Sequence, residues 1–243
     1  MQEEEFLKDL KWSIEETERK NSFKPTTCYK PSSMTCIRNM YYQATGTDPD
    51  PSTTDYCLVN ICNSGSDIHV RLQKEVEDMK TNGIDCEYID VGDYITTNNI
   101  PDVIVRGKSG METKLHHEKY NMNFMCDGVI KYKGEYYILE LKTETSRKWM
   151  SRLDVDDAHK DQATAYSLSL GLDKVLFIYV NRDFLDMKSF MLTVTDDMRQ
   201  SLVNKITTCD SYVDSKTVPP KPFDLQPSQC KYCIYKSTCK KDL

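Results

Sequence analysis

Two carboxylates and a lysine stand close together in one short stretch, MCDGVIKYKGEYYILELKTET, residues 125–145. Asp127 lies among apolar residues, and Glu140 and Lys142 flank a single leucine. Burying charge among apolar neighbours is costly unless the charges are paired or hold a metal ion. Carboxylate oxygens are the ligands that Mg²⁺ and Mn²⁺ prefer. The three residues therefore predict a site for a hard divalent cation.

A β-hairpin is the element that must position these side chains. Apolar runs on either side of Lys133-Gly134 predict two paired strands around a tight turn. Asp127 and Glu140 then approach each other across the pair, and Glu140 and Lys142 point to the same face. A metal held there would neutralise phosphate charge and activate a water for phosphodiester hydrolysis, with the lysine orienting that water. The alternative is a surface hairpin with an ordinary Glu–Lys pair.

Three further residues have the type and spacing to join such a site. His69 lies one helical turn from Leu72, which turns its imidazole inward, although an inward histidine is also a common core residue. Gln162 and Tyr166 are four residues apart and share one helix face, where a tyrosine buried in the core is the alternative. His116, His117 and His159 fit no motif, and we expect them at the surface.

The cysteines gather at the end of the chain, where Cys230, Cys233 and Cys239 supply three soft ligands for a metal. A tetrahedral site needs a fourth ligand, and the spacing alone leaves Zn²⁺ and an iron–sulfur cluster open.

The N-terminus is acidic and amphipathic, unlike a signal or transit peptide. We therefore expect a cytoplasmic protein, of cellular, phage or viral origin, whose ten cysteines are not in disulfides.

Composition limits the remaining options. The 243 residues are 39% hydrophobic and 10% aromatic, enough for one large domain with a core, and no apolar run is long enough to predict a membrane span. A net charge of −6 argues against a non-specific electrostatic coat on nucleic acid but allows a local basic groove. The basic segment 142–152 makes Arg147, Lys148 and Arg152 candidate phosphate contacts, and Glu144 has no predicted role.

Hydrophobic periodicity predicts a mixed α/β (α+β) chain. Helices are expected at 3–20, 32–44, 66–80 (capped by Ser66-Asp67), 158–171 and 196–208. Strands are expected at 86–91, 102–107, within 112–130, and at 135–142, 174–180 and 188–194. This order predicts a single domain over 1–243, with a central mixed sheet flanked by helices.

The charged hairpin resembles the PD-(D/E)xK nuclease superfamily. Cys126-Asp127-Gly128-Val129-Ile130 resembles its first motif and Leu139-Glu140-Leu141-Lys142-Thr143 its second. Gly65-Ser66-Asp67-Ile68-His69 and Asp161-Gln162-Ala163-Thr164-Ala165-Tyr166 resemble the G-x-x-x-H and Q-x-x-x-Y segments of RecB-like nucleases. The resemblance implies a restriction-endonuclease-like core in which His69, Asp127 and Glu140 bind Mg²⁺ or Mn²⁺. It also implies that Lys142 positions the water and that Gln162 and Tyr166 contact the strand.

The cysteines extend the resemblance to RecB-like nucleases with an iron–sulfur cluster. Ser32 to Tyr42 (SSMTCIRNMYY) resembles the upstream segment that carries their first cysteine. The resemblance implies that Cys36, with Cys28 as second choice, joins the three C-terminal cysteines around a structural [4Fe–4S] cluster. Residues 25–60 and 219–243 would then form a cluster-binding subdomain. Ile37 departs from the family, which has proline there, and residues 105–120 match no family segment.

The resemblance is closest to the CRISPR-associated RecB-type exonucleases (the Cas-four group) and to AddB-like nuclease domains. It implies an exonuclease acting on single-stranded DNA or DNA ends, with protein partners in CRISPR adaptation, recombination or repair. An endonuclease or nickase of the same superfamily is one alternative. The other is a non-catalytic nucleic-acid-binding scaffold with a structural zinc site, which the presence of every motif residue counts against.

Overall fold

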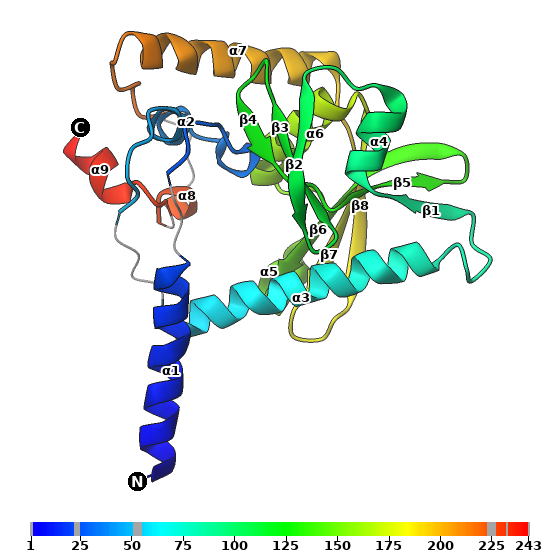
Figure 1. Ribbon diagram of the computed structural model, residues 1–243, viewed down its shortest axis with the longest axis horizontal. Coiled ribbons are helices and arrows are strands. Elements are labelled where there is room, and N and C mark those ends of the chain that lie inside the picture. The colour runs from blue at the N-terminus through cyan, green and yellow to red at the C-terminus, as the bar shows by residue number, and fades with distance from the viewer. Residues whose placement is uncertain (1, 22–24, 51–54, 223–226, 232, 243) are drawn as a thin grey trace.

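Two β-sheets and the helices that pack on them form the body of the protein (Figure 1). The computed structural model describes residues 2–21, 25–50, 55–222, 227–231 and 233–242. The five-stranded sheet has the order β1-β5-β6-β7-β8, and the three-stranded sheet has the order β2-β3-β4. Strands β6 and β7 are parallel and the other neighbours are antiparallel, so the larger sheet is mixed. The predicted α/β class with a central mixed sheet is confirmed.

The strands of the larger sheet are β1 (Cys86–Ile89), β5 (Gly128–Tyr132), β6 (Glu135–Glu144), β7 (Lys174–Asn181) and β8 (Met187–Thr193). Those of the smaller sheet are β2 (Val103–Ser109), β3 (Glu112–His117) and β4 (Met122–Phe124). The helices are α1 (Gln2–Lys20), α2 (Ile37–Ala44), α3 (Tyr56–Asp78), α4 (Val91–Asn98), α5 (Ser146–Ser151), α6 (Asp157–Leu170), α7 (Asp196–Asp214), α8 (Pro227–Lys231) and α9 (Lys236–Lys241), with a 3-10 turn at Pro31–Ser33. None of these helices is both long and apolar enough to cross a membrane.

The predicted hairpin is present as β5 and β6. Gly128 pairs with Leu139, and Lys133 and Gly134 turn the chain with positive φ angles of 50° and 84°. Asp127 therefore lies at the start of β5, opposite Glu140 on β6. Alternation along β6 sends Leu139 and Leu141 to the face covered by α3. Glu140 and Lys142 face the other side, where α6 packs.

Several element boundaries differ from the predicted ones. Helix α3 starts at Tyr56, ten residues before the predicted start at Ser66, because the Asp55 carboxylate accepts a hydrogen bond from the Leu58 N–H at 2.9 Å. Helix α4 was missed; it is capped by Asp90 and ended by Asn99 in the left-handed region, with φ 50°. The predicted helix at 32–44 is split into a short 3-10 turn and α2. Helix α5 was also missed, and α7 runs to Asp214.

Segments from the two ends of the chain are joined by one arginine. The Arg38 side chain is 5% exposed, and its guanidinium donates to the carbonyl oxygens of Pro219 at 2.7 Å, Cys239 at 3.0 Å and Asp242 at 2.9 Å. Tyr42 donates to the Asp242 carboxylate at 2.7 Å. Hydrogen bonds to a charged donor are stronger than neutral ones. Helix α2 and the C-terminal residues are therefore held together although they are about two hundred residues apart in sequence.

The end of β6 is fixed by a buried ion pair. Glu144 and Arg152 are 4% and 9% exposed, and the guanidinium bonds both oxygens of the carboxylate, at 2.5 and 2.7 Å. Arg152 also reaches Asp156, the N-cap of α6, at 3.0 Å and stacks on the Tyr179 ring. Burial acts to raise the pKa of Glu144, but the ion pairs with Arg152 and Lys148 lower it overall.

We predict that replacing Arg152 with methionine lowers the free energy of unfolding by about 3 kcal/mol, because a buried carboxylate loses its main partner. Lys148, 3.2 Å from Glu144, offsets part of the loss. Arg147→Met is the matched control, since Arg147 is an exposed arginine of α5, the helix that Arg152 follows as its C-cap. Urea denaturation measures both variants at pH 7. Equal stability of the two variants would contradict the structural role of Arg152.

Folding lowers the pKa of Glu144 from its ordinary value of 4.5. The ion pair therefore stabilises the folded state at pH values above 4.5. This contribution is lost as the pH falls below that value. The stability difference between wild type and Arg152→Met should therefore narrow on acidification.

Candidate active site

Asp127 is fixed from every side at the junction of α3, β1 and β6. Its carboxylate accepts the backbone N–H of Leu141 at 2.7 Å and meets Nδ1 of His69 at 2.9 Å. Its backbone carbonyl accepts from Gln73 at 2.6 Å and from the Tyr88 hydroxyl at 2.7 Å. With 4% of its surface exposed, Asp127 has little rotational freedom. It is held in one orientation, as a metal ligand needs to be.

The residue after Asp127 must be glycine for this packing to exist. A Cβ on Gly128 would lie 2.4 Å from the Tyr88 ring, closer than side-chain atoms approach one another. The missing side chain therefore lets Tyr88 lie over the strand and bond the Asp127 carbonyl.

A chain of hydrogen bonds runs from Glu140 to helix α6. Lys142 Nζ lies 2.5 Å from Glu140 and donates to the Gln162 amide oxygen at 3.0 Å. Gln162 donates to the Tyr166 hydroxyl at 2.6 Å, and Tyr166 donates to the Met125 carbonyl at 2.6 Å. Burial raises the pKa of Glu140, the Lys142 ammonium opposes this, and the Asp127 charge adds to it. The structure thus brings together all the predicted catalytic residues.

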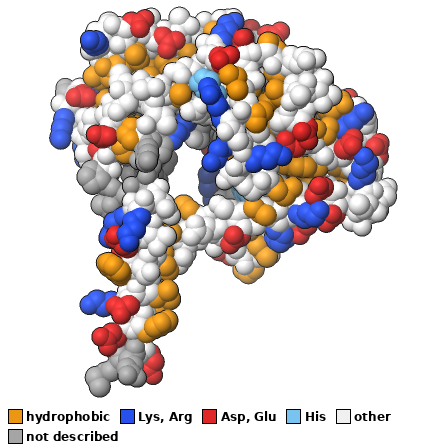
Figure 2. All heavy atoms as spheres, in the orientation of Figure 1, with side chains coloured by type: hydrophobic (Ala, Val, Ile, Leu, Met, Phe, Trp, Pro, Cys, Tyr) orange, Lys and Arg blue, Asp and Glu red, His pale blue; other side chains and the backbone are white. Residues whose placement is uncertain are grey.

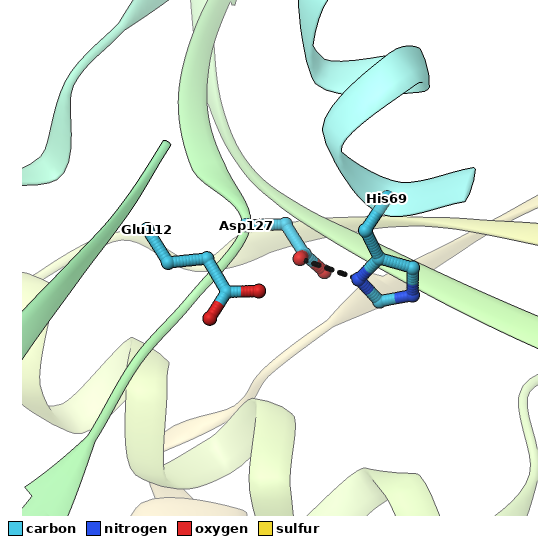
Figure 3. A group of neighbouring side chains, drawn as sticks. All are labelled: His69, Glu112 and Asp127. Carbon is cyan, nitrogen blue, oxygen red and sulfur yellow. Dashed lines mark hydrogen bonds and ion pairs between the residues drawn. The ribbon is translucent and has the colours of Figure 1, made fainter. Parts of the chain in front are cut away.

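His69, Glu112 and Asp127 form a candidate metal site, with ligand atoms within 4.8 Å of one another. Figure 3 shows the Glu112 carboxylate pointing toward the hydrogen-bonded Asp127 and His69. Burial acts to lower the pKa of His69, but Asp127 raises it overall. The predicted metal set had Glu140 as its third member. Glu140 lies in the same pocket, but its carboxylate is engaged by Lys142.

Glu112 is the site residue that sequence analysis missed. It begins β3, in the segment 105–120 that matched no family motif. Its carboxyl is half-buried, and burial raises its pKa, with the nearby Asp127 charge adding to the effect. Its position at the pocket depends on how the smaller sheet packs, and no local spacing in the sequence encodes that.

One pocket of about 810 Å³ contains these groups. Its walls come from α3, from β6 with α6, from the smaller sheet and from residues 26–32. The lining includes the acids Glu112, Asp127 and Glu140 and the cations Lys30, Arg106, Lys114 and Lys142. Figure 2 shows a hollow above α3, with Lys and Arg side chains on its rim. The pocket is open enough to admit a ligand and carries both signs of charge.

The predicted phosphate contacts lie outside this lining. Arg152 is buried against Glu144 as described above, and Lys148 bridges Glu144 and Asp156 at 3.2 and 2.9 Å. Arg147 is exposed on α5. The three histidines expected at the surface are also placed differently. His117 is 4% exposed, and His116 and His159 are half-buried, His116 bonding Asn123 and His159 bonding the Tyr179 hydroxyl.

A second cavity, of about 340 Å³, is lined by Cys36, Cys230, Cys233 and Cys239. Burial raises the pKa of Cys36, and the neighbouring Cys239 and Cys230 raise it further. Arg38 donates to the Cys239 sulfur at 3.2 Å, and the Tyr235 N–H donates to the Cys233 sulfur at 3.5 Å. Cys28, the second choice for the fourth position, lines the other pocket.

No family model matches the chain, and no curated protein is similar to it. Among solved structures, "Crystal structure of SSO0001" aligns over 93% of this chain and 92% of its own, with a TM-score of 0.49 and 16% identity. The alkaline exonuclease LHK-Exo from Laribacter hongkongensis aligns over 79% of this chain and 90% of its own, with a TM-score of 0.43 and 10% identity. Its complex with dAMP has the same coverage, a TM-score of 0.41 and 9% identity.

We predict that Glu112→Gln weakens Mn²⁺ binding at least tenfold, because removing one charged ligand of three costs about 1.4 kcal/mol or more. Isothermal titration calorimetry with Mn²⁺ measures the affinity. Glu118→Gln removes an exposed glutamate that follows the same strand and should leave the affinity unchanged. Equal affinity of both variants would remove Glu112 from the metal site.

Proposed function

We propose that this protein is a metal-dependent nuclease that hydrolyses phosphodiester bonds in the pocket around Asp127. The observation that carries the proposal is the meeting of two groups in one pocket. One is the candidate metal site of His69, Glu112 and Asp127, and the other is the Glu140–Lys142 pair beside it. Metal-dependent phosphodiester hydrolysis uses these two components, a cation site for the phosphate and a positioned polar group for the water.

The residues present fit a hard divalent cation. Three carboxylates line the pocket. Burial raises the pKa of Glu112 and of Glu140, and the charge of Asp127 adds to both effects. A bound Mg²⁺ or Mn²⁺ would neutralise phosphate charge and lower the pKa of a bound water. The carboxylate oxygens of Glu112 and Asp127 suit both ions.

Lys142 positions the attacking water. Its ammonium has two fixed partners, Glu140 and Gln162, which leave a third N–H of the three available to the pocket. Gln162 and Tyr166 hold the lysine and the loop before Asp127 in register, because Tyr166 bonds the Met125 carbonyl. They thereby set the distance between the metal ligands and the lysine, in addition to the strand contacts that the family resemblance implies.

For the substrate, we propose single-stranded DNA or DNA ends, with cleavage from an end. The lining of the pocket supports this choice, since residues of both sheets surround its reactive groups, and a single strand fits between them more easily than an intact duplex. An endonuclease or nickase built on the same site is the alternative.

For the cysteine cavity, we propose a structural [4Fe–4S] cluster held by Cys36, Cys230, Cys233 and Cys239. The cavity of about 340 Å³ that these cysteines line leaves room for a group larger than a single zinc ion. Donors to sulfur, such as Arg38, are also the contacts that tune clusters.

We predict that the protein degrades end-labelled single-stranded DNA in the presence of Mn²⁺ and leaves a circular strand intact. Lys142→Ala should lower the rate at least a hundredfold, because the water loses its positioning group. Lys131→Ala, on the partner strand and outside the pocket lining, should retain wild-type activity. Gel electrophoresis of the products measures both.

Cleavage of the circular strand would favour the endonuclease alternative. A folded wild-type protein that cleaves neither strand with either metal would contradict the nuclease assignment.

We predict that protein purified without oxygen is brown, absorbs near ~400 nm and contains iron. Cys36→Ala should lose colour and iron, because the cluster loses a ligand. Cys28→Ala should keep both, because Cys28 lines the other pocket. Absorbance and metal analysis give the result, and a colourless wild type with bound zinc would contradict the cluster.

A further inference from the structure

One face of the smaller sheet forms a wall of the catalytic pocket. Glu112, Lys114 and His116 alternate along β3 and therefore share a face. Asn123, the partner of His116 on β4, lies on the same face and bonds His116 at 2.8 Å. All four residues line the pocket of Asp127. The opposite face of β3, with Thr113, Leu115 and His117, is buried.

A β-bulge adds a second cation to this wall. The register between β2 and β3 shifts between Val105 and Gly107, so Arg106 is the additional residue. Gly107 has φ 145°, which L-residues rarely adopt, and it pairs with Lys114. Bulges re-aim side chains next to active sites. Arg106 accordingly lines the pocket beside Lys114.

Neither of these cations has a carboxylate partner among the residues that the structure describes. Both side chains belong to exposed residues. Lys108, two residues after Arg106, lies on the other face of β2 and pairs with Asp90 at 3.0 Å. Lys142 in the same pocket pairs with Glu140. Arg106 and Lys114 therefore retain positive charge that can meet an anionic ligand beside the metal site.

We propose that Arg106 and Lys114 form a phosphate-binding wall for a single strand of nucleic acid. This rests on the proposed nuclease function, and it places the two cations on phosphates next to the one that is cleaved. A chain of phosphates can occupy the metal site and contact the two cations at once, because the acids bind the metal at one phosphate and the cations bind its neighbours. The wall also explains how a protein of net charge −6 holds nucleic acid.

The test is the salt dependence of binding. A fluorescent 12-nucleotide thymidine strand is bound to the full-length protein in Ca²⁺, and fluorescence anisotropy gives the affinity over a NaCl series. For single strands the log–log slope changes by about 0.7 for each phosphate contact. Arg106→Ala and Lys114→Ala should each flatten the slope by about 0.7, and the double variant by about 1.4. Arg106→Lys should keep the slope, since the charge remains.

Lys108→Ala is the matched control, because it removes a cation from the same strand but from the opposite face. Its slope should equal that of wild type, and thermal melting should show that every variant is folded. With Mn²⁺, the double variant should show a raised KM. Inorganic phosphate and the unlabelled strand are each tested as competitors of the fluorescent strand. If phosphate competes as strongly as the unlabelled strand, the site binds a single anion and the proposal is overturned.

If the folded double variant keeps the wild-type salt dependence while wild type still binds and cleaves, the phosphate-binding wall is wrong and the proposed nuclease function is unaffected. Failure of wild type both to bind and to cleave would overturn the two together.

Discussion

The buried hydrogen bond from the Leu141 N–H to the Asp127 carboxylate, 2.7 Å long, is the contact on which the site depends. It ties the acid of one strand to the backbone between Glu140 and Lys142 on the next. The three charged residues therefore move as one unit with the hairpin. His69 then adds α3 to this unit through the other carboxylate oxygen.

An ion pair outside the pocket also helps to fix the positions of the site residues. The Glu144–Arg152 pair joins the end of β6 to Asp156, which caps α6. Helix α6 carries Gln162 and Tyr166, whose hydrogen bonds return to Lys142 and to the residue two before Asp127. Because charge-assisted bonds are directional, this loop of contacts fixes the distance between helix and strands. The site is rigid on the side of the larger sheet.

The hairpin and the larger helices were predictable because their signals are local. Turn residues at Lys133-Gly134 and alternating apolar residues specify β5 and β6 without reference to the rest of the chain. The start of α3 was not predictable, because its cap, Asp55, follows a segment rich in Pro, Ser and Thr, a composition typical of loops. Helix α4 is short and contains glycine and two threonines, which lower helix propensity, so its caps at Asp90 and Asn99 were the only signal.

Sequence patterns did not locate the side chains that the smaller sheet contributes. Glu112 and Arg106 reach the pocket through sheet packing and a register shift, neither of which leaves a spacing in the sequence. For Arg152 the sequence pattern predicted a role that the fold does not allow. It lies in a basic segment that suggested phosphate contacts, but its guanidinium is paired with Glu144, eight residues earlier. The sequence shows which residues are charged, but the partner of each charged side chain depends on the fold.

Diffraction from crystals of the protein soaked in Mn²⁺, collected at the manganese absorption edge, tests the central claim most directly. We expect an anomalous peak between His69, Glu112 and Asp127, within about 2.3 Å of their ligand atoms. An empty map at this position, with manganese bound elsewhere or not at all, would contradict a metal-dependent reaction in this pocket.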